Sequence, residues 1–174
     1  MVLNAQAQAA LTAPGSDVTA LRELFAELLV RPDNIQHLAE LIAGSDVRYA
    51  MGGTDAHPLV GRFVPDLDLR LPTGETARLA ELIRTARPLL LDLTEGAVLA
   101  EELRPWLDRV DPVTAQPHSP APAFTALLLR PDCYVAWASA SPRPDPADLD
   151  ALRTAAQQWF GPGRCTVPWP STRH

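Results

Sequence analysis

Residues 123–138 read AFTALLLRPDCYVAWA, two short apolar runs separated by the polar tetrapeptide RPDC at 130–133. Proline and aspartate supply turn geometry, and apolar runs of this length bounded by such residues favour β-strands. The stretch therefore predicts a β-hairpin with strands at 123–129 and 134–138. The last residue of such a turn often needs a positive φ, which strains a cysteine such as Cys133 but not a glycine.

The segments around this hairpin alternate between strand and helix patterns. The upstream patterns predict a strand at 67–71, a turn at 72–75, a helix at 76–85, a buried strand at 88–93, a helix at 97–107, a strand at 110–115 and a proline-rich loop at 116–122. An amphipathic helix is expected at 146–160. A parallel βαβ unit followed by a β-hairpin and a terminal helix is the thioredoxin-like arrangement. We therefore expect an α/β fold with a mixed sheet flanked by helices, over residues 67–163.

An N-terminal helical extension is expected before this domain. Residues 1–45 predict an arm or short helix followed by two amphipathic helices, the first capped by Ser16 or Asp17 and ending near Val30. Asp33 is the predicted cap of the second helix, which ends at Gly44. Two helices of this size cannot bury their apolar stripes on each other alone, so they need a further surface. A Gly/Pro-rich connecting segment at 46–66 and a tail at 164–174 complete the chain.

Composition excludes several classes of protein. The 174 residues carry a formal charge of -6, which argues against a phosphate-binding nucleic-acid protein. Neither a membrane-spanning apolar run nor a signal-peptide pattern occurs, so we expect a cytoplasmic protein without membrane association. The two cysteines, Cys133 and Cys165, exclude a disulfide scaffold and a zinc site built from four thiolates.

The sequence contains no set of residues with the spacing of a known catalytic or cofactor site. Redox-active thioredoxin-like proteins carry C-x-x-C after the first buried strand, where this chain has Thr94-Glu95-Gly96-Ala97. There is no G-x-G-x-x-G, so no cradle for a flavin or nicotinamide is expected. His57 has Asp55 nearby, but His57-Pro58 favours a structural turn over a metal ligand. We predict no catalytic residue, no metal site and no cofactor in this chain.

Three motifs occur in order along the chain: Asp46-Val47-Arg48-Tyr49, then His57-Pro58 with Gly61-Arg62, then Pro65-Asp66 with Leu69. Together with 79–82, 89–93 and 129–137, they resemble FAD-dependent aromatic hydroxylases. The branch is the phenol-hydroxylase-like group, which includes aromatic polyketide hydroxylases of actinomycete antibiotic pathways. The resemblance covers about residues 1–160. That family usually carries glycine where this chain has Cys133.

The resemblance implies that the chain is the C-terminal thioredoxin-like domain of such an enzyme, as a fragment or a free-standing relative. In the family this domain lacks the dithiol and serves structure or association, while FAD and substrate bind to the preceding domains. FAD is therefore expected only in a full-length homologue or a partner. The implied role is a non-catalytic module in aromatic polyketide biosynthesis that forms a homodimer or docks to an oxygenase.

Two alternatives stay open. The chain could be a small enzyme or polyketide-binding protein whose glycine-rich loop places Arg48, Tyr49, His57 and Asp66 around an aromatic polyketide. Arg62 completes the set of candidate ligand or interface residues. A redox role for Cys133 and Cys165 is the third hypothesis, although the two thiols are 32 positions apart (165 − 133).

Overall fold

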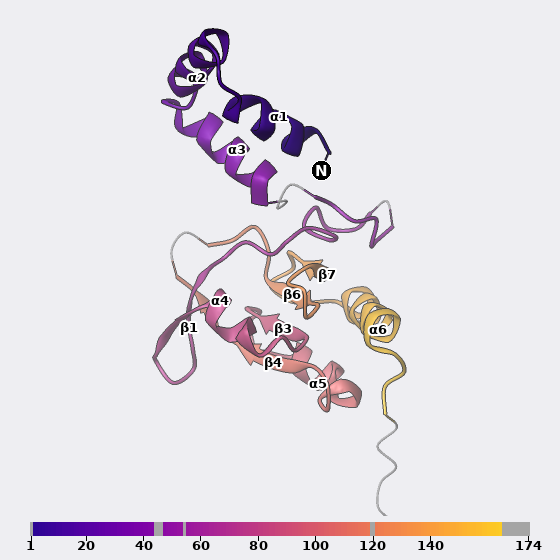
Figure 1. The fold of residues 1–174 in the computed structure, drawn as a ribbon. Coiled ribbons are helices and arrows are strands. Elements are labelled where there is room, and N and C mark those ends of the chain that lie inside the picture. The colour runs from indigo at the N-terminus through magenta and orange to yellow at the C-terminus, as the bar shows by residue number, and fades with distance from the viewer. Residues whose placement is uncertain (1, 44–46, 54, 119–120, 165–174) are drawn as a thin grey trace, which may run out of the picture. The chain divides into compact units, whose positions relative to one another are not determined.

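The computed structural model describes residues 2–43, 47–53, 55–118 and 121–164 (Figure 1). The chain forms two compact units, Met1–Val47 and Arg48–His174. The predicted connecting segment at 46–66 belongs, from Arg48 onward, to the second unit. The predicted end of the second helix at Gly44 and almost all of the predicted tail lie outside the described residues.

The main sheet of the second unit has four strands in the order β4-β3-β6-β7. They are β3 (Leu89–Asp92), β4 (Asp111–Thr114), β6 (Ala126–Leu129) and β7 (Val135–Ser139). Strand β3 runs parallel to β4 and antiparallel to β6, and β6 pairs with β7 as a hairpin. All residues of β3, β6 and β7 are buried. The predicted hairpin and the thioredoxin-like mixed sheet are confirmed.

A second, smaller sheet has the order β2-β1-β5. It consists of β1 (Asp68–Arg70), β2 (Thr76–Arg78) and β5 (Gln116–Pro117). The prediction of a helix from residue 76 is therefore wrong at its start, because the turn at 71–75 folds β2 back along β1. Only α4 (Leu79–Leu82) and a 3-10 turn at 83–85 are helical. The predicted loop at 116–122 likewise begins with the short strand β5, which pairs with β1.

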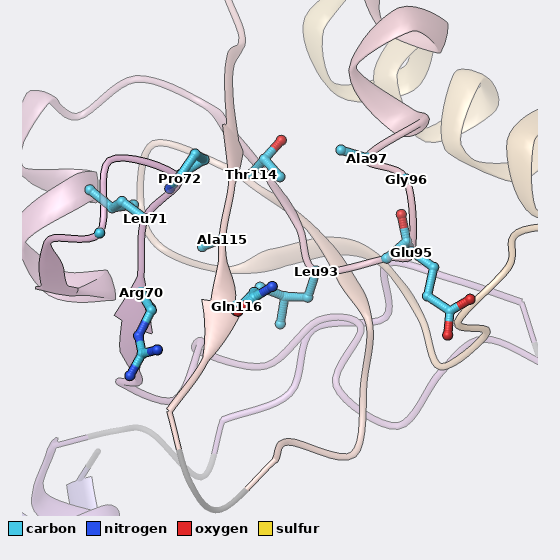
Figure 2. Close-up of a pocket in the computed structure, with 12 residues that line it drawn as sticks. Arg70, Leu71, Pro72, Leu93, Glu95, Gly96, Ala97, Thr114, Ala115 and Gln116 are labelled. Carbon is cyan, nitrogen blue, oxygen red and sulfur yellow. The ribbon is translucent and has the colours of Figure 1, made fainter.

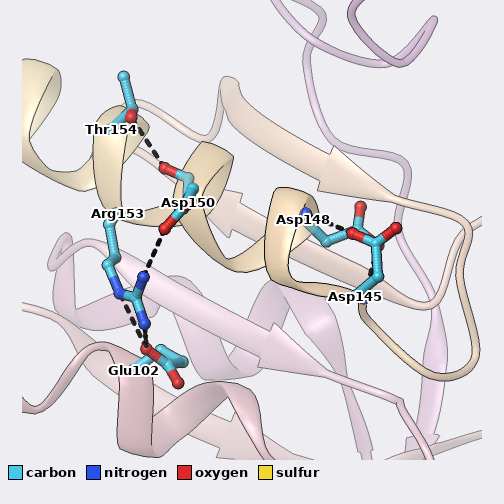
Figure 3. A network of polar contacts seen from close by, with 6 residues as sticks. All are labelled: Glu102, Asp145, Asp148, Asp150, Arg153 and Thr154. Atoms are coloured by element: carbon cyan, nitrogen blue, oxygen red, sulfur yellow. Dashed lines mark hydrogen bonds and ion pairs between the residues drawn. The ribbon is translucent and has the colours of Figure 1, made fainter.

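Two helices pack against the main sheet and against each other. Helix α5 (Leu99–Glu102), followed by a 3-10 turn at 104–106, is shorter than the predicted helix at 97–107. Helix α6 (Pro146–Phe160) has the predicted bounds, and Asp145 caps it by accepting a hydrogen bond from Asp148 N. The Arg153 side chain on α6 donates hydrogen bonds to Asp150 of the same helix and to Glu102 of α5 (Figure 3). This network joins α5 to α6 across 51 residues of sequence.

Residues 61–64 of the connecting segment extend the main sheet, because their backbone forms hydrogen bonds with residues 133–135 at the start of β7. Gly61 N donates to Val135 O, Val135 N donates to Arg62 O, and Val64 N donates to Cys133 O, each at 2.9 Å. Gly61 has a φ of 81°, and a Cβ atom there would lie 2.0 Å from Tyr49 O. Only glycine permits this approach of two backbones, which fixes the start of the second unit beside β7.

The first unit contains α1 (Val2–Thr12), α2 (Ser16–Leu28) and α3 (Pro32–Ala43). The predicted caps are wrong. Gly15 is the cap of α2 and has no side chain that could form a capping bond, while α3 begins at Pro32, which tolerates the first helical position because no N–H is needed there. Arg22 instead ends α1 by donating to the carbonyls of Leu11 and Ala13. No described side chain between residues 6 and 39 is buried, so this unit has no core of its own.

The turn between β6 and β7 holds Cys133 at a φ of 66°, as the sequence predicts. Its N–H donates to Arg130 O at 3.0 Å, which closes the turn. A residue with a Cβ atom is strained in this left-handed conformation.

We expect the Cys133→Gly variant to be more stable than Cys133→Ala by about 1 kcal/mol, because both remove the sulfur and only glycine relieves the strain. Urea unfolding followed by tryptophan fluorescence measures the difference, since every tryptophan lies after residue 100. Equal stability of the two variants would contradict a strained turn.

Candidate functional site at the ends of the parallel strands

A buried carboxylate marks the carboxyl end of β3. Asp92 is 1% exposed and has no ion-pair partner among the residues that the structure describes. Its Oδ1 accepts hydrogen bonds from Thr94 N (3.0 Å) and Thr94 Oγ1 (2.6 Å), and its Oδ2 accepts one from Leu99 N (3.0 Å). A buried charge is tolerated only when it is so bonded. Asp92 therefore fixes the turn that leads from β3 into α5.

That turn is the position of the dithiol in redox-active relatives of this fold, and Thr94–Ala97 occupies it as the sequence predicts. Gly96 and Ala97 have φ values of 88° and 50°. Two consecutive left-handed residues, one of them an alanine, store backbone strain that the Asp92 bonds hold in place. The turn carries no thiol.

A pocket of about 540 Å³ lies between this turn, the β1–β2 hairpin and the segment that follows β4 (Figure 2). Its lining comprises Arg70, Leu71, Pro72, Gly74, Leu93, Thr94, Glu95, Gly96, Ala97, Thr114, Ala115 and Gln116. Ligands of open α/β sheets bind beyond the carboxyl ends of the strands, which is where this pocket lies. Sequence reasoning missed it, because the strand at 67–71 and the turn at 72–75 were predicted without the pairing that brings them beside the turn after β3.

The predicted residues Arg48 and Tyr49 line a hollow of about 400 Å³ together with Val60. Arg48 Nε donates to Val60 O at 3.1 Å, so the guanidinium helps to hold the segment in place. The Tyr49 ring meets the ring of Tyr134 edge-on, with 4.8 Å between centroids.

His57 lines a neighbouring pocket of about 500 Å³ with Asp55, Trp137 and Asp148. Its Nδ1 accepts a hydrogen bond from Leu59 N at 3.2 Å, and Nε2 lies 3.4 Å from Ala123 O. The first bond assigns the hydrogen to Nε2. These contacts are those of a residue that stabilises a turn, as the His57-Pro58 sequence favours.

Arg62 and Asp66 have different surroundings. Arg62 is exposed and contributes its carbonyl to the edge of β7. Asp66 Oδ1 accepts from Leu67 N and Ala80 N at 3.1 Å, and its other oxygen pairs with Arg78, so Asp66 orders the start of α4. The structure brings Arg48 and Tyr49 together, places His57 in the adjacent pocket, and positions Asp66 at α4.

The described residues do not fit a flavin dinucleotide. The turn after β3 has one glycine and no repeated Gly-x-Gly pattern, and the backbone N–H groups of Thr94 and Leu99, which could otherwise bind a pyrophosphate, already donate to Asp92. In the ranges that the structure describes, no group of three His, Cys, Asp or Glu side chains could hold a metal ion. Nor is any helix in those ranges long and apolar enough to cross a membrane.

The mixed sheet and the turn after β3 define a thioredoxin-like domain that lacks the dithiol at its usual position. Residues 57–163 match the family described as aromatic-ring hydroxylase, C-terminal. The chain belongs to this family, as the sequence motifs predict.

Proteins of antibiotic biosynthesis are among its relatives. Anhydrotetracycline monooxygenase of Streptomyces rimosus is 45% identical over 163 residues, which cover 91% of this chain and 31% of the relative. The structure of OxyS anhydrotetracycline hydroxylase from Streptomyces rimosus is 42% identical with a TM-score of 0.71, covering 91% of this chain and 32% of that one. CabE, an aromatic hydroxylase from angucycline biosynthesis, is 38% identical with a TM-score of 0.68, covering 91% and 32%. This chain thus spans about a third of the length of these relatives.

We expect Asp92→Asn to lower the free energy of unfolding by about 2 kcal/mol, because the amide group turns one acceptor into a donor that faces a backbone N–H. Urea unfolding measures the change. The control is Asp150→Asn at the exposed partner of Arg153, for which the loss should stay below about 0.5 kcal/mol. Equal losses in the two variants would show that Asp92 does not order the turn.

Burial, and secondly the Asp132 carboxylate, raise the pKa of the Cys133 thiol above its ordinary value of 9.0. Because the folded thiol keeps its proton to higher pH, we expect iodoacetamide to alkylate Cys133 at pH 8 roughly threefold or more slowly in the folded chain than in urea. A Cys165→Ser background isolates the reaction, and mass spectrometry follows it. Alkylation at the same rate in both states would support a reactive, redox-competent cysteine.

Proposed function

We propose that this chain is a non-catalytic structural and association module of aromatic polyketide hydroxylation, and that it docks to the flavin-bearing part of an oxygenase. Membership of the C-terminal family and the names of the relatives support this role. So does the span of the match, because a third of each relative corresponds to this chain and the remaining part carries no counterpart here.

The observation that carries the docking proposal is an exposed leucine stripe on α2. Leu21, Leu24 and Leu28 recur at helical spacing and are 45%, 54% and 50% exposed. Val18, Phe25 and Leu29 lie beside these leucines on the helix surface and are half-buried, so the leucines form the exposed edge of one wide apolar stripe. Isolated helices of this length are marginal in water, and a contiguous exposed apolar stripe indicates a partner surface.

The chemistry-bearing side chains of the second unit support a structural role. Arg48 and His57 are hydrogen-bonded to backbone groups of their own segment, and Asp66 is bonded to the start of α4. The turn after β3 has threonine and alanine where a dithiol would stand. These contacts favour a module that stabilises and orients over one that reacts.

The test uses the Streptomyces rimosus relative shortened to the part that this chain does not match, co-expressed with this chain. We expect a one-to-one complex by light scattering, flavin only in the shortened relative, and slower amide exchange in α2 upon binding. A Leu24→Asp/Leu28→Asp double variant should weaken the complex at least about tenfold, because it places charges in an apolar interface.

The matched control is Val98→Asp, an exposed apolar position of the second unit, which should leave the complex intact. A dimer of this chain alone that the α2 double variant dissociates would overturn docking in favour of self-association. Stoichiometric FAD on the isolated chain, with oxygen-dependent conversion of an aromatic compound, would overturn the non-catalytic role.

A further inference from the structure

The pocket beyond β3 and β4 has the construction of a ligand site that the proposed function does not use. Its volume of about 540 Å³ is within the range of small-molecule pockets. One wall is the turn held by three hydrogen bonds to the buried Asp92, so the pocket is formed before any ligand arrives. Preformed walls avoid the entropy cost of ordering a loop on binding.

The lining holds one basic and one acidic side chain, and only the acidic one has an ion-pair partner among the described residues. Arg70 has no ion-pair partner among the described residues, whereas most other arginines of the second unit pair with a carboxylate. The acidic residue of the lining, Glu95, is already bound by Arg143, whose Nε donates to Glu95 Oε2 at 2.9 Å. One guanidinium is thus left to face an anion at this pocket, and guanidinium groups bind carboxylates through paired hydrogen bonds.

The remaining lining separates into apolar and hydrogen-bonding parts. Leu71 and Leu93 pack against the core and are half-buried, and Ala97 adds a third apolar surface. The half-buried hydroxyl of Thr114 and the amide of Gln116 are the neutral polar groups (Figure 2). Arg70 and Gln116 are direct partners in the β1–β5 register, so their side chains start from one face of the small sheet.

From this arrangement we propose that the pocket binds a small carboxylate with a flat apolar body. The carboxylate pairs with Arg70 beside Gln116, and the body lies between the hairpin wall at Leu71 and the turn wall at Leu93 and Ala97. This inference is independent of docking through α2, because every residue of the pocket belongs to the second unit.

The test titrates the full chain with 2-naphthoate and follows backbone amide signals by NMR. We expect saturable shifts at residues 93–97 and 114–116, and roughly tenfold weaker binding of the neutral analogue 2-naphthamide. Arg70→Gln should weaken 2-naphthoate about tenfold and leave 2-naphthamide unchanged, so that the two probes bind the variant equally.

The matched control is Arg84→Gln, because Arg84 is also exposed and without an ion pair in the described ranges but does not line the pocket. It should bind both probes like the parent chain, and the spectra of both variants report directly whether they are folded. Three results would overturn the proposal: no saturation at millimolar probe, shifts confined to other residues, or equal affinities of the parent chain and Arg70→Gln for 2-naphthoate.

Discussion

The structure of the second unit depends on the burial of both faces of its central strands. Every residue of β3, β6 and β7 is buried, so side chains that alternate between the two faces must all be covered. Leu99 and Leu103 near α5, Leu152 and Ala156 on α6, and Val60 and Val64 of the connecting segment supply buried partners. The irregular segment before β1 is therefore part of the core, and the domain begins at Arg48 rather than at its first strand.

Asp92 is the buried carboxylate of this sheet among the described residues, and it connects the fold to the candidate site. Three hydrogen-bond donors from the segment that follows β3 take the place of water around the Asp92 carboxylate. This turn forms one wall of the pocket. In redox-active members of the fold, thiols occupy the same turn. Here Thr94–Ala97 occupy the turn, and it carries no thiol.

The sequence was informative where a pattern was long or chemically specific. The runs at 88–93, 123–129 and 134–138 predicted the buried strands, and the RPDC turn predicted the positive φ of Cys133. The pattern failed at 76–78, where three residues are too few to show a period and the hairpin with β1 decides the conformation. It also failed for the caps at Ser16 and Asp33, because Gly15 and Pro32 satisfy the helix starts through backbone geometry. The pocket could not be predicted, since Arg70, Ala97 and Gln116 meet only through the pairing of β1 with β5 and the turn after β3.

Strand β4 has a property that limits how this domain can assemble. Asp111 N donates to Pro88 O and Ala115 N donates to Asp92 O, so the nitrogen of Pro112 faces the open side of the sheet. Proline offers no hydrogen there, and a fifth strand from another molecule would find a gap in the row of donors. Crowded copies of this domain are thereby hindered from joining into continuous sheets or fibrils along β4.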